Sequence, residues 1–349
     1  MKLGVNLGYW GAGNDAANLQ LAQQADELGW SSVWVAEAYG SDAPTVMAWV
    51  AAQTTQIDVG AAVMQIPART PAMTAMTAAT LDTLSGGRFR LGLGVSGPQV
   101  SEGWHGVRFG KPLGRTREYV EIVRMALERK RRVKFDGEHY RLPLPDGPGR
   151  ALILTVHPVR DHIPTYLAAV GPKNLELAGE IADGLLAVFF STDFGAEQLA
   201  VVRAGREKVG KTMEGFDVVA TVPVVVGDDL ERCADPVRGY SALYVGGMGS
   251  REKNFYNQLA VRMGYADAAA EVQDKYLRRD YDGAMAALPF EFLDRTSLLG
   301  PVERIAEGLK AYAAAGVTTL AVAAFPGGLI SPAETLRAVD EAYELAGLA

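Results

Sequence analysis

The chain has 349 residues, of which 48% are hydrophobic and 21% are charged, and its formal net charge is −7. This composition is typical of a globular protein, and the negative charge argues against binding to a nucleic-acid backbone. The single cysteine, Cys233, excludes a disulfide framework and a multi-cysteine metal site, and the histidines do not have the spacing of metal ligands. Because no run of about 20 apolar residues occurs, we expect a soluble, cytoplasmic protein with no metal and no membrane partner.

Short apolar segments alternate with amphipathic helices along the chain. The order helix, glycine, strand recurs around Gly29, Gly184 and Gly316, and Gly29 is predicted to end its helix in a left-handed conformation. Candidate strands lie at 2–8, 32–37, 57–64, 88–95, 164–169, 184–190, 217–226 and 317–324. Eight such strands, followed by a helix at 333–346, predict an α/β protein with a single (β/α)8 TIM-barrel domain over 1–349. A doubly wound sheet is the alternative.

Two inserted segments interrupt the simple repeat, at about 98–160 and 228–300. The first contains a predicted helix around 115–130 and a predicted hairpin at 135–142 (FDGEHYRL). The second is predicted to be a helical block between strands seven and eight, without a strand of its own. The sequence leaves open whether this block forms a lid or a dimer surface.

The segment 91–106 (LGLGVSGPQVSEGWHG) contains the spacing GxGxxG at Gly92, Gly94 and Gly97. A dinucleotide site would require a helix that begins at the third glycine, and Pro98 together with Gly103 argues against such a helix. We therefore expect these glycines to make space at the carboxyl end of a barrel strand. Packing and a tight turn alone are the alternative.

A helix is predicted to begin at Thr70-Pro71, because proline is favoured in the first turn. Met73, Met76, Thr80 and Leu84 share one face of this helix, which we interpret as packing against the barrel.

The order of three motifs along this region resembles the luciferase-like monooxygenase superfamily, and within it the branch that depends on coenzyme F420. The motifs are PxRTP at 67–71, LSGGR at 84–88 and LGLGVSG at 91–97, and the segments 33–45, 135–143 and 168–184 are also similar to that family. The resemblance implies a TIM barrel, a homodimer, and either F420 or FMN bound at the carboxyl ends of the strands.

The resemblance also implies a cofactor site. A non-proline cis peptide is expected between Ala62 and Val63, behind the cofactor ring. The cofactor phosphate is expected at the start of the helix that follows residue 170, where exposed amides favour an anion and Lys173 adds a cation. The alternative is an ordinary strand-to-helix turn. The predicted cofactor-binding residues are Ala62, Val63, Ser96, Gly97, Pro98, Val170, Gly171, Pro172 and Lys173.

Glu37 and His105 are the predicted catalytic residues, because hydride chemistry on such a cofactor needs a nearby proton carrier. Glu37 is also open to an interpretation as an orienting carboxylate, and His105 to one as a turn cap. The other residues considered near the site are Tyr39 and Glu102 as proton carriers, and Trp10 and Trp104 as pocket walls or packing residues.

Two departures from the family bear on the reaction. Ala38 and Pro98 stand where relatives that oxidise alcohols carry a histidine and a glutamate. We therefore predict an F420-dependent oxidoreductase that transfers a hydride to or from a small organic substrate, and favour reduction of an activated double bond. The alternatives are an FMN-dependent monooxygenase, a non-catalytic flavin-binding protein and, more distantly, an NAD-dependent enzyme. Substrate specificity is expected in the loops 9–16, 98–112 and 228–300.

Overall fold

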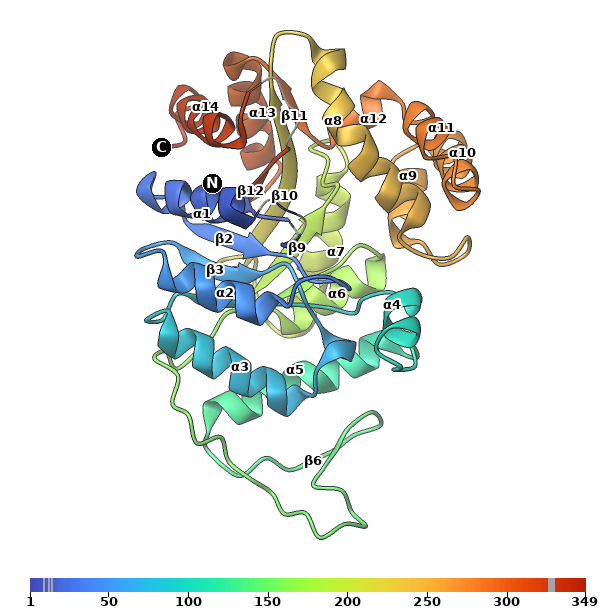
Figure 1. Ribbon diagram of the computed structural model, residues 1–349. Helices are drawn as coiled ribbons and strands as arrows, with labels where there is room; N and C mark the ends of the chain where they lie inside the picture. The colour runs from blue at the N-terminus through green and yellow to red at the C-terminus, as the bar shows by residue number, and fades with distance from the viewer. Residues whose placement is uncertain (9, 12, 14, 326–329) are drawn as a thin grey trace.

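The structure is a computed structural model that describes residues 1–349 except 9, 12, 14 and 326–329. Eight parallel strands form a closed barrel surrounded by helices (Figure 1). The barrel strands are β1 Lys2–Asn6, β2 Ser32–Val35, β3 Asp58–Ala61, β5 Phe89–Gly94, β8 Thr165–Ala168, β9 Gly184–Val188, β10 Asp217–Val226 and β12 Thr319–Ala324. The predicted α/β fold and all eight predicted strands are confirmed. Part of the 9–16 loop lies outside the described residues.

The register of the strands closes the sheet. β1 pairs with β2 on one side and with β12 on the other, and β10 joins β12 to β9. Leu185 and Ala187 of β9 are buried in the layer between strands and helices, whereas Leu186 is buried inside the barrel. Burial of both faces explains the continuous apolar runs, and the closed ring excludes the doubly wound alternative.

The outer helices begin and end where the local sequence predicts. Thr70 caps α3 by accepting a hydrogen bond from the Met73 amide at 3.2 Å, and Pro71 is the first helical residue. Gly29 follows the first helix with a φ of 72°, which glycine adopts without a Cβ clash. The barrel helices are α1 Asp15–Glu27, α2 Ala43–Ala52, α3 Pro71–Leu84, α5 Pro112–Glu128, α6 Pro172–Ile181, α7 Gly195–Lys208, α13 Val302–Ala314 and α14 Pro332–Leu345. No helix among the described residues is both long and apolar enough to cross a membrane.

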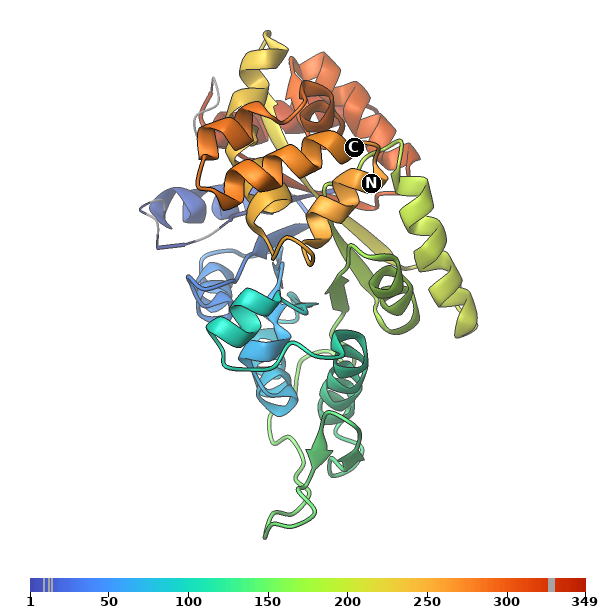
Figure 2. The same cartoon turned by 90° about the vertical axis from the view of Figure 1, so that its right-hand side faces the viewer.

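The two inserted segments lie where the sequence places them. The first contains the predicted hairpin, formed by β6 Phe135–Asp136 and β7 Arg141–Leu142. The second is a helical block at the carboxyl end of the barrel (Figure 2). Its helices are α8 Leu230–Ala242, α9 Phe255–Arg262, α10 Ala266–Leu277, α11 Tyr281–Ala286 and α12 Phe290–Arg295. The expectation that this block lacks a strand is wrong. The segment Leu298–Gly300 forms β11, because the long strand β10 continues past its barrel neighbours and offers β11 an edge.

The helix α3 differs from its predicted packing. Met73, Met76 and Leu84 are 49%, 50% and 64% exposed, so the face that they share points to solvent. The small residues Ala75, Ala78 and Ala79 face inward instead and let the helix lie close to the strands. The interpretation of the methionine face as barrel packing is therefore wrong.

A polar cluster fills the amino end of the barrel. Arg90 on β5 donates hydrogen bonds to Asp58 at 2.8 Å and to Asp217 at 3.2 Å, and Tyr166 donates to Asp217 at 3.0 Å. Trp34 and Tyr166 stack edge to face in the layer above, with ring centroids 5.2 Å apart. Burial raises the pKa of the Tyr166 hydroxyl, which therefore stays protonated. This cluster fills the amino end of the barrel, and in barrels of this kind ligands bind at the carboxyl end.

Asp26 fixes the turn between α2 and β3. Its carboxylate accepts hydrogen bonds from the amides of Thr55 at 2.7 Å, Gln56 at 2.8 Å and Ile57 at 2.6 Å. Burial alone would raise the pKa of Asp26, but these bonds favour the ionised form and outweigh it, so the pKa is lowered. A carboxyl with a lowered pKa stabilises the fold above a pH of about 4, and this stabilisation is lost as the pH falls through the folded-state pKa.

We expect Asp26→Ala to lower the free energy of unfolding by about 3 kcal/mol at neutral pH, because three backbone amides lose a charged acceptor that is itself buried. The difference from wild type should shrink below a pH of about 4. Urea denaturation at a series of pH values measures it. A difference that is constant down to the lowest pH at which the wild type is folded would contradict this account.

Candidate active site at the carboxyl end of the barrel

Two glycines of β5 make room for the chain that leaves β3. A Cβ at Gly92 would lie 1.7 Å from the carbonyl oxygen of Ala61, and a Cβ at Gly94 would lie 2.5 Å from the Val63 side chain. The peptide between Ala62 and Val63 is cis, as the resemblance implies. Gly92 and Gly94 therefore allow close packing against the segment that leaves β3, as the packing alternative predicts. That the glycines also make space for a ligand stays a prediction.

The expectation that no helix follows Gly97 is wrong. A short helix, α4 Pro98–Gly103, begins directly after it, because proline at the first helical position costs no hydrogen bond. The dinucleotide interpretation still fails, since β5 belongs to a closed barrel.

Ser96 is joined to the strand-three segment by a hydrogen bond. Its hydroxyl lies 2.9 Å from Oε1 of Gln65, which belongs to the short strand β4 Met64–Gln65. Ser96 has a φ of 61°, a conformation that residues other than glycine seldom adopt. The described structure thus holds a partly exposed hydroxyl at the end of β5. Gln65 did not stand out in the sequence, because its function depends on a contact across strands.

Glu37 lies at the centre of a buried polar network. Arg69 binds both of its carboxylate oxygens, at 2.6 and 2.8 Å, and the amide of Ala43 donates to Oε2 at 3.0 Å. Arg69 also pairs with Asp42. Burial would lower the pKa of Arg69, but the two carboxylates outweigh it and raise that pKa. These contacts occupy the Glu37 carboxylate with protein partners and favour its interpretation as an orienting group.

The turn at the start of α6 carries two cations. Lys173 is exposed in the first turn, and Gly171, the residue before the helix, has no side chain to cap it. Arg262, from α9 of the helical block, donates to the carbonyl oxygen of Val170 at 3.1 Å. Burial lowers the pKa of Arg262, and neither cation has a carboxylate partner among the residues that the structure describes. No sequence motif points to Arg262, because only the folded insertion brings α9 to the end of β8.

The remaining candidates are not joined to this network by any contact in the described part of the chain. The backbone of His105 donates to Val100 at the end of α4, and its Nε2 atom is buried without a protein partner there. Glu102 accepts a hydrogen bond from the amide of Phe109 at 2.9 Å. Tyr39 and Trp104 are exposed, and Trp10 packs partly against the main core. The catalytic function of His105 stays a prediction.

Aromatic side chains lie between the barrel and the helical block. Phe189, directly after β9, contacts Tyr240 and Tyr244, with ring centroids 5.5 Å apart in each pair. Tyr240 also contacts Phe325, directly after β12, at 5.3 Å. Since both phenylalanines follow the carboxyl ends of their strands, the block covers this side of the barrel end with aromatic rings. The sequence did not single out these residues.

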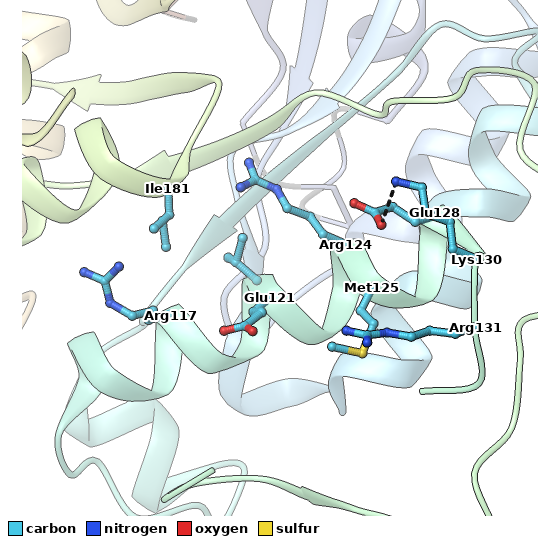
Figure 3. A pocket seen from close by; sticks show the side chains of 9 residues that line it. Arg117, Glu121, Arg124, Met125, Glu128, Lys130, Arg131 and Ile181 are labelled. Atoms are coloured by element: carbon cyan, nitrogen blue, oxygen red, sulfur yellow. Dashed lines mark ion pairs between the residues drawn. The ribbon is translucent and has the colours of Figure 1, made fainter. Parts of the chain in front are cut away.

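A groove of about 640 Å³ lies elsewhere, on the outer surface of α5 (Figure 3). Arg117, Arg124 and Lys130 line it, and each pairs with a carboxylate, of Glu180, Asp183 and Glu128 respectively. None of its lining residues follows the carboxyl end of a barrel strand, so we place the candidate site at the barrel end. No cluster of potential metal ligands occurs in the described chain.

Comparison with known proteins identifies the family of the chain. A family profile described as luciferase-like monooxygenase matches residues 8–319. This chain belongs to the luciferase-like monooxygenase family. The match spans the cis peptide, the glycines of β5, the start of α6 and the helical block.

Two relatives and one solved structure are similar to the chain over most of its length. A Mycobacterium tuberculosis protein provisionally named a coenzyme F420-dependent oxidoreductase is 43% identical over 93% of this chain and 95% of its own length. A 5,10-methylenetetrahydromethanopterin reductase of Archaeoglobus fulgidus is 30% identical over 84% of this chain and 85% of its own. The F420-dependent tetrahydromethanopterin reductase of Methanopyrus kandleri has the same fold, with a TM-score of 0.82, 22% identity and 97% coverage of both chains.

Proposed function

We propose that this luciferase-like enzyme is an F420-dependent oxidoreductase that transfers a hydride between the deazaflavin and a small organic substrate. The observation that carries the proposal is the pair of cations at the start of α6. Lys173 and Arg262 have no carboxylate partner in the described chain, and both lie at the barrel end that holds Ser96. An anionic group such as the phosphate of F420 fits this arrangement, and relatives of the chain are named for that cofactor.

The remaining predicted residues fit the other parts of such a cofactor. Ala62 and Val63 would lie behind the ring, and Ser96, Gly97 and Pro98 would contact it. Within the described structure, a Cβ at Gly97 would have no neighbour closer than 3.7 Å, so backbone and space are open there. Bound F420 supplies the hydride chemistry, and the chain orients the ring and excludes water.

We further propose that the substrate carries an activated double bond that is reduced. Ala38 and Pro98 cannot exchange a proton with an alcohol, and the Glu37 carboxylate is occupied by Arg69. His105 remains the proton carrier that we predict for the reduced product. Aromatic rings from the helical block would form one wall of the substrate space.

Titration of the purified protein with F420 and with FMN, followed by fluorescence, tests this function. We expect F420 to bind and the loaded protein to turn over members of a panel of enones, imines and alcohols. Tight FMN binding with oxygen consumption would support the FMN-dependent monooxygenase instead. This alternative is kept because the family is described as a monooxygenase family. Binding of F420 without turnover of any compound would support a non-catalytic binding protein.

The cations at α6 give a sharper prediction. Lys173→Ala and Arg262→Ala should each weaken F420 binding about tenfold, because each removes one charged hydrogen-bond donor. Lys310→Ala is the matched control, since Lys310 is a partly exposed lysine on the outer helix α13 that pairs with Glu307. Fluorescence titration measures the affinities. Unchanged F420 affinity in both variants would show that the phosphate does not bind at this turn.

We also propose that two copies of the chain pair through α2 and α3. These helices lie side by side (Figure 1) and expose Trp49, Met73, Met76 and Leu84. Exposed apolar patches of this kind mark contact surfaces. The double substitution Met73→Lys and Met76→Lys should halve the mass measured by light scattering, whereas Val209→Lys, at another exposed apolar position, should leave it unchanged. A wild-type protein that is monomeric at micromolar concentration would contradict the pairing.

A further inference from the structure

The amide of Gln65 has only one orientation that satisfies its neighbours. Its Nε2 atom lies 2.5 Å from the carbonyl oxygen of Ala38 and 3.5 Å from Oε1 of Glu37, and both of these atoms can only accept. The nitrogen therefore faces Ala38 and Glu37, and Oε1 faces Ser96. Since Oε1 can only accept, the single hydroxyl proton of Ser96 is donated to it, at 2.9 Å.

The surroundings of Gln65 hold this orientation in place. Gln65 is 3% exposed, and its backbone amide donates to Glu37 at 3.3 Å. Glu37 is in turn fixed by Arg69, which also binds Asp42. Burial makes rotation of the amide costly, because rotation would set the amide oxygen against two acceptors, the Ala38 carbonyl oxygen and Oε1 of Glu37.

We propose that Gln65 is a positioning residue that fixes the Ser96 hydroxyl as a hydrogen-bond acceptor toward the ligand at the barrel end. With its proton committed to Gln65, the Ser96 oxygen can offer only lone pairs. The ligand must then present an N–H or O–H group at this point. This inference rests on the proposed function, and in that setting the donor is an N–H of the cofactor ring.

A double-mutant cycle separates this role from general packing. Ser96→Ala removes the hydroxyl but keeps the Cβ, so a side chain still has to adopt the positive φ of this position. Gln65→Leu removes the amide. If Gln65 acts through Ser96, each substitution should weaken F420 binding about tenfold, and the double variant should be no weaker than either single one. Affinities that fall by the product of the two factors would overturn the inference.

Gln65→Glu supplies a readout that a packing role would not move. The introduced carboxyl would sit against Glu37, with Arg69 and Asp42 as the other charged groups of the network. When protonated, it can donate to Ala38 and accept from Ser96 as the amide does. When ionised, it would set an acceptor against the Ala38 carbonyl oxygen and a second negative charge against Glu37, and this repulsion would move the carboxylate away from its place beside Ser96. F420 affinity relative to wild type should therefore be low at a pH of about 8 and recover toward wild type at a pH of about 5.

Each affinity is compared with that of the wild type at the same pH, so that titration of F420 itself cancels. Thermal melts of each variant check that it is folded. If the ratio of the Gln65→Glu affinity to the wild-type affinity does not change with pH, the proposed role of Gln65 is wrong. A wild type that binds F420 but shows additive variants defeats this inference alone, whereas a wild type that binds no F420 defeats the proposed function as well.

Discussion

Replacement of Gly92 by alanine is expected to destabilise the protein by about 3 kcal/mol or more, since overpacking against backbone cannot be relieved by a change of rotamer. The added Cβ would lie 1.7 Å from the carbonyl oxygen of Ala61 and 2.9 Å from the Leu186 side chain. The strand that precedes the cis peptide would have to move. Chemical denaturation measures the loss of stability, and fluorescence titration measures the accompanying loss of F420 binding.

Gly40→Ala is the control, because a Cβ there would have no neighbour within 4 Å and its φ is not positive. This variant should unfold at the same denaturant concentration as wild type. A Gly92→Ala protein with wild-type stability and ligand binding would show that the strands can separate without cost.

Replacement of Arg69 by methionine is expected to cost about 3–5 kcal/mol, the usual result of leaving one partner of a buried ion pair. The Glu37 side chain is 6% exposed and would lose the two bonds of 2.6 and 2.8 Å from the guanidinium. The folded state would then hold a buried carboxylate without its cation, which is the source of the cost.

The double variant Arg69→Met, Glu37→Gln provides the matched comparison. It removes the uncompensated charge, so it should be more stable than Arg69→Met alone at neutral pH. Urea denaturation of both variants and of the wild type measures the difference. Equal stability of the two variants would show that the pair contributes no charge interaction.

The barrel could be predicted from sequence because its signals are local. Each strand is a short apolar run, and Gly29 and Thr70-Pro71 mark helix ends by their own backbone preferences. The strand β11 was missed because three residues carry no periodic pattern, and it forms only where β10 supplies a free edge. The methionine face of α3 was misinterpreted because periodicity identifies a face without telling which way it points.

The features of the candidate site also fall into those with a local sequence signal and those without one. The cis peptide and the turn before α6 follow from motifs that are continuous in the chain. Gln65 and Arg262 gain their importance from partners 31 and 92 residues away. No local pattern records such contacts, so the tertiary structure was needed to find them.

The polar cluster of Arg90, Asp58 and Asp217 closes the amino end of the barrel. A cofactor and a substrate that both bind at the carboxyl end must therefore enter from the same side. The one that lies deeper must enter first and leave last. We therefore expect an ordered kinetic scheme, in which the cofactor binds before the substrate and is exchanged only after the product has departed.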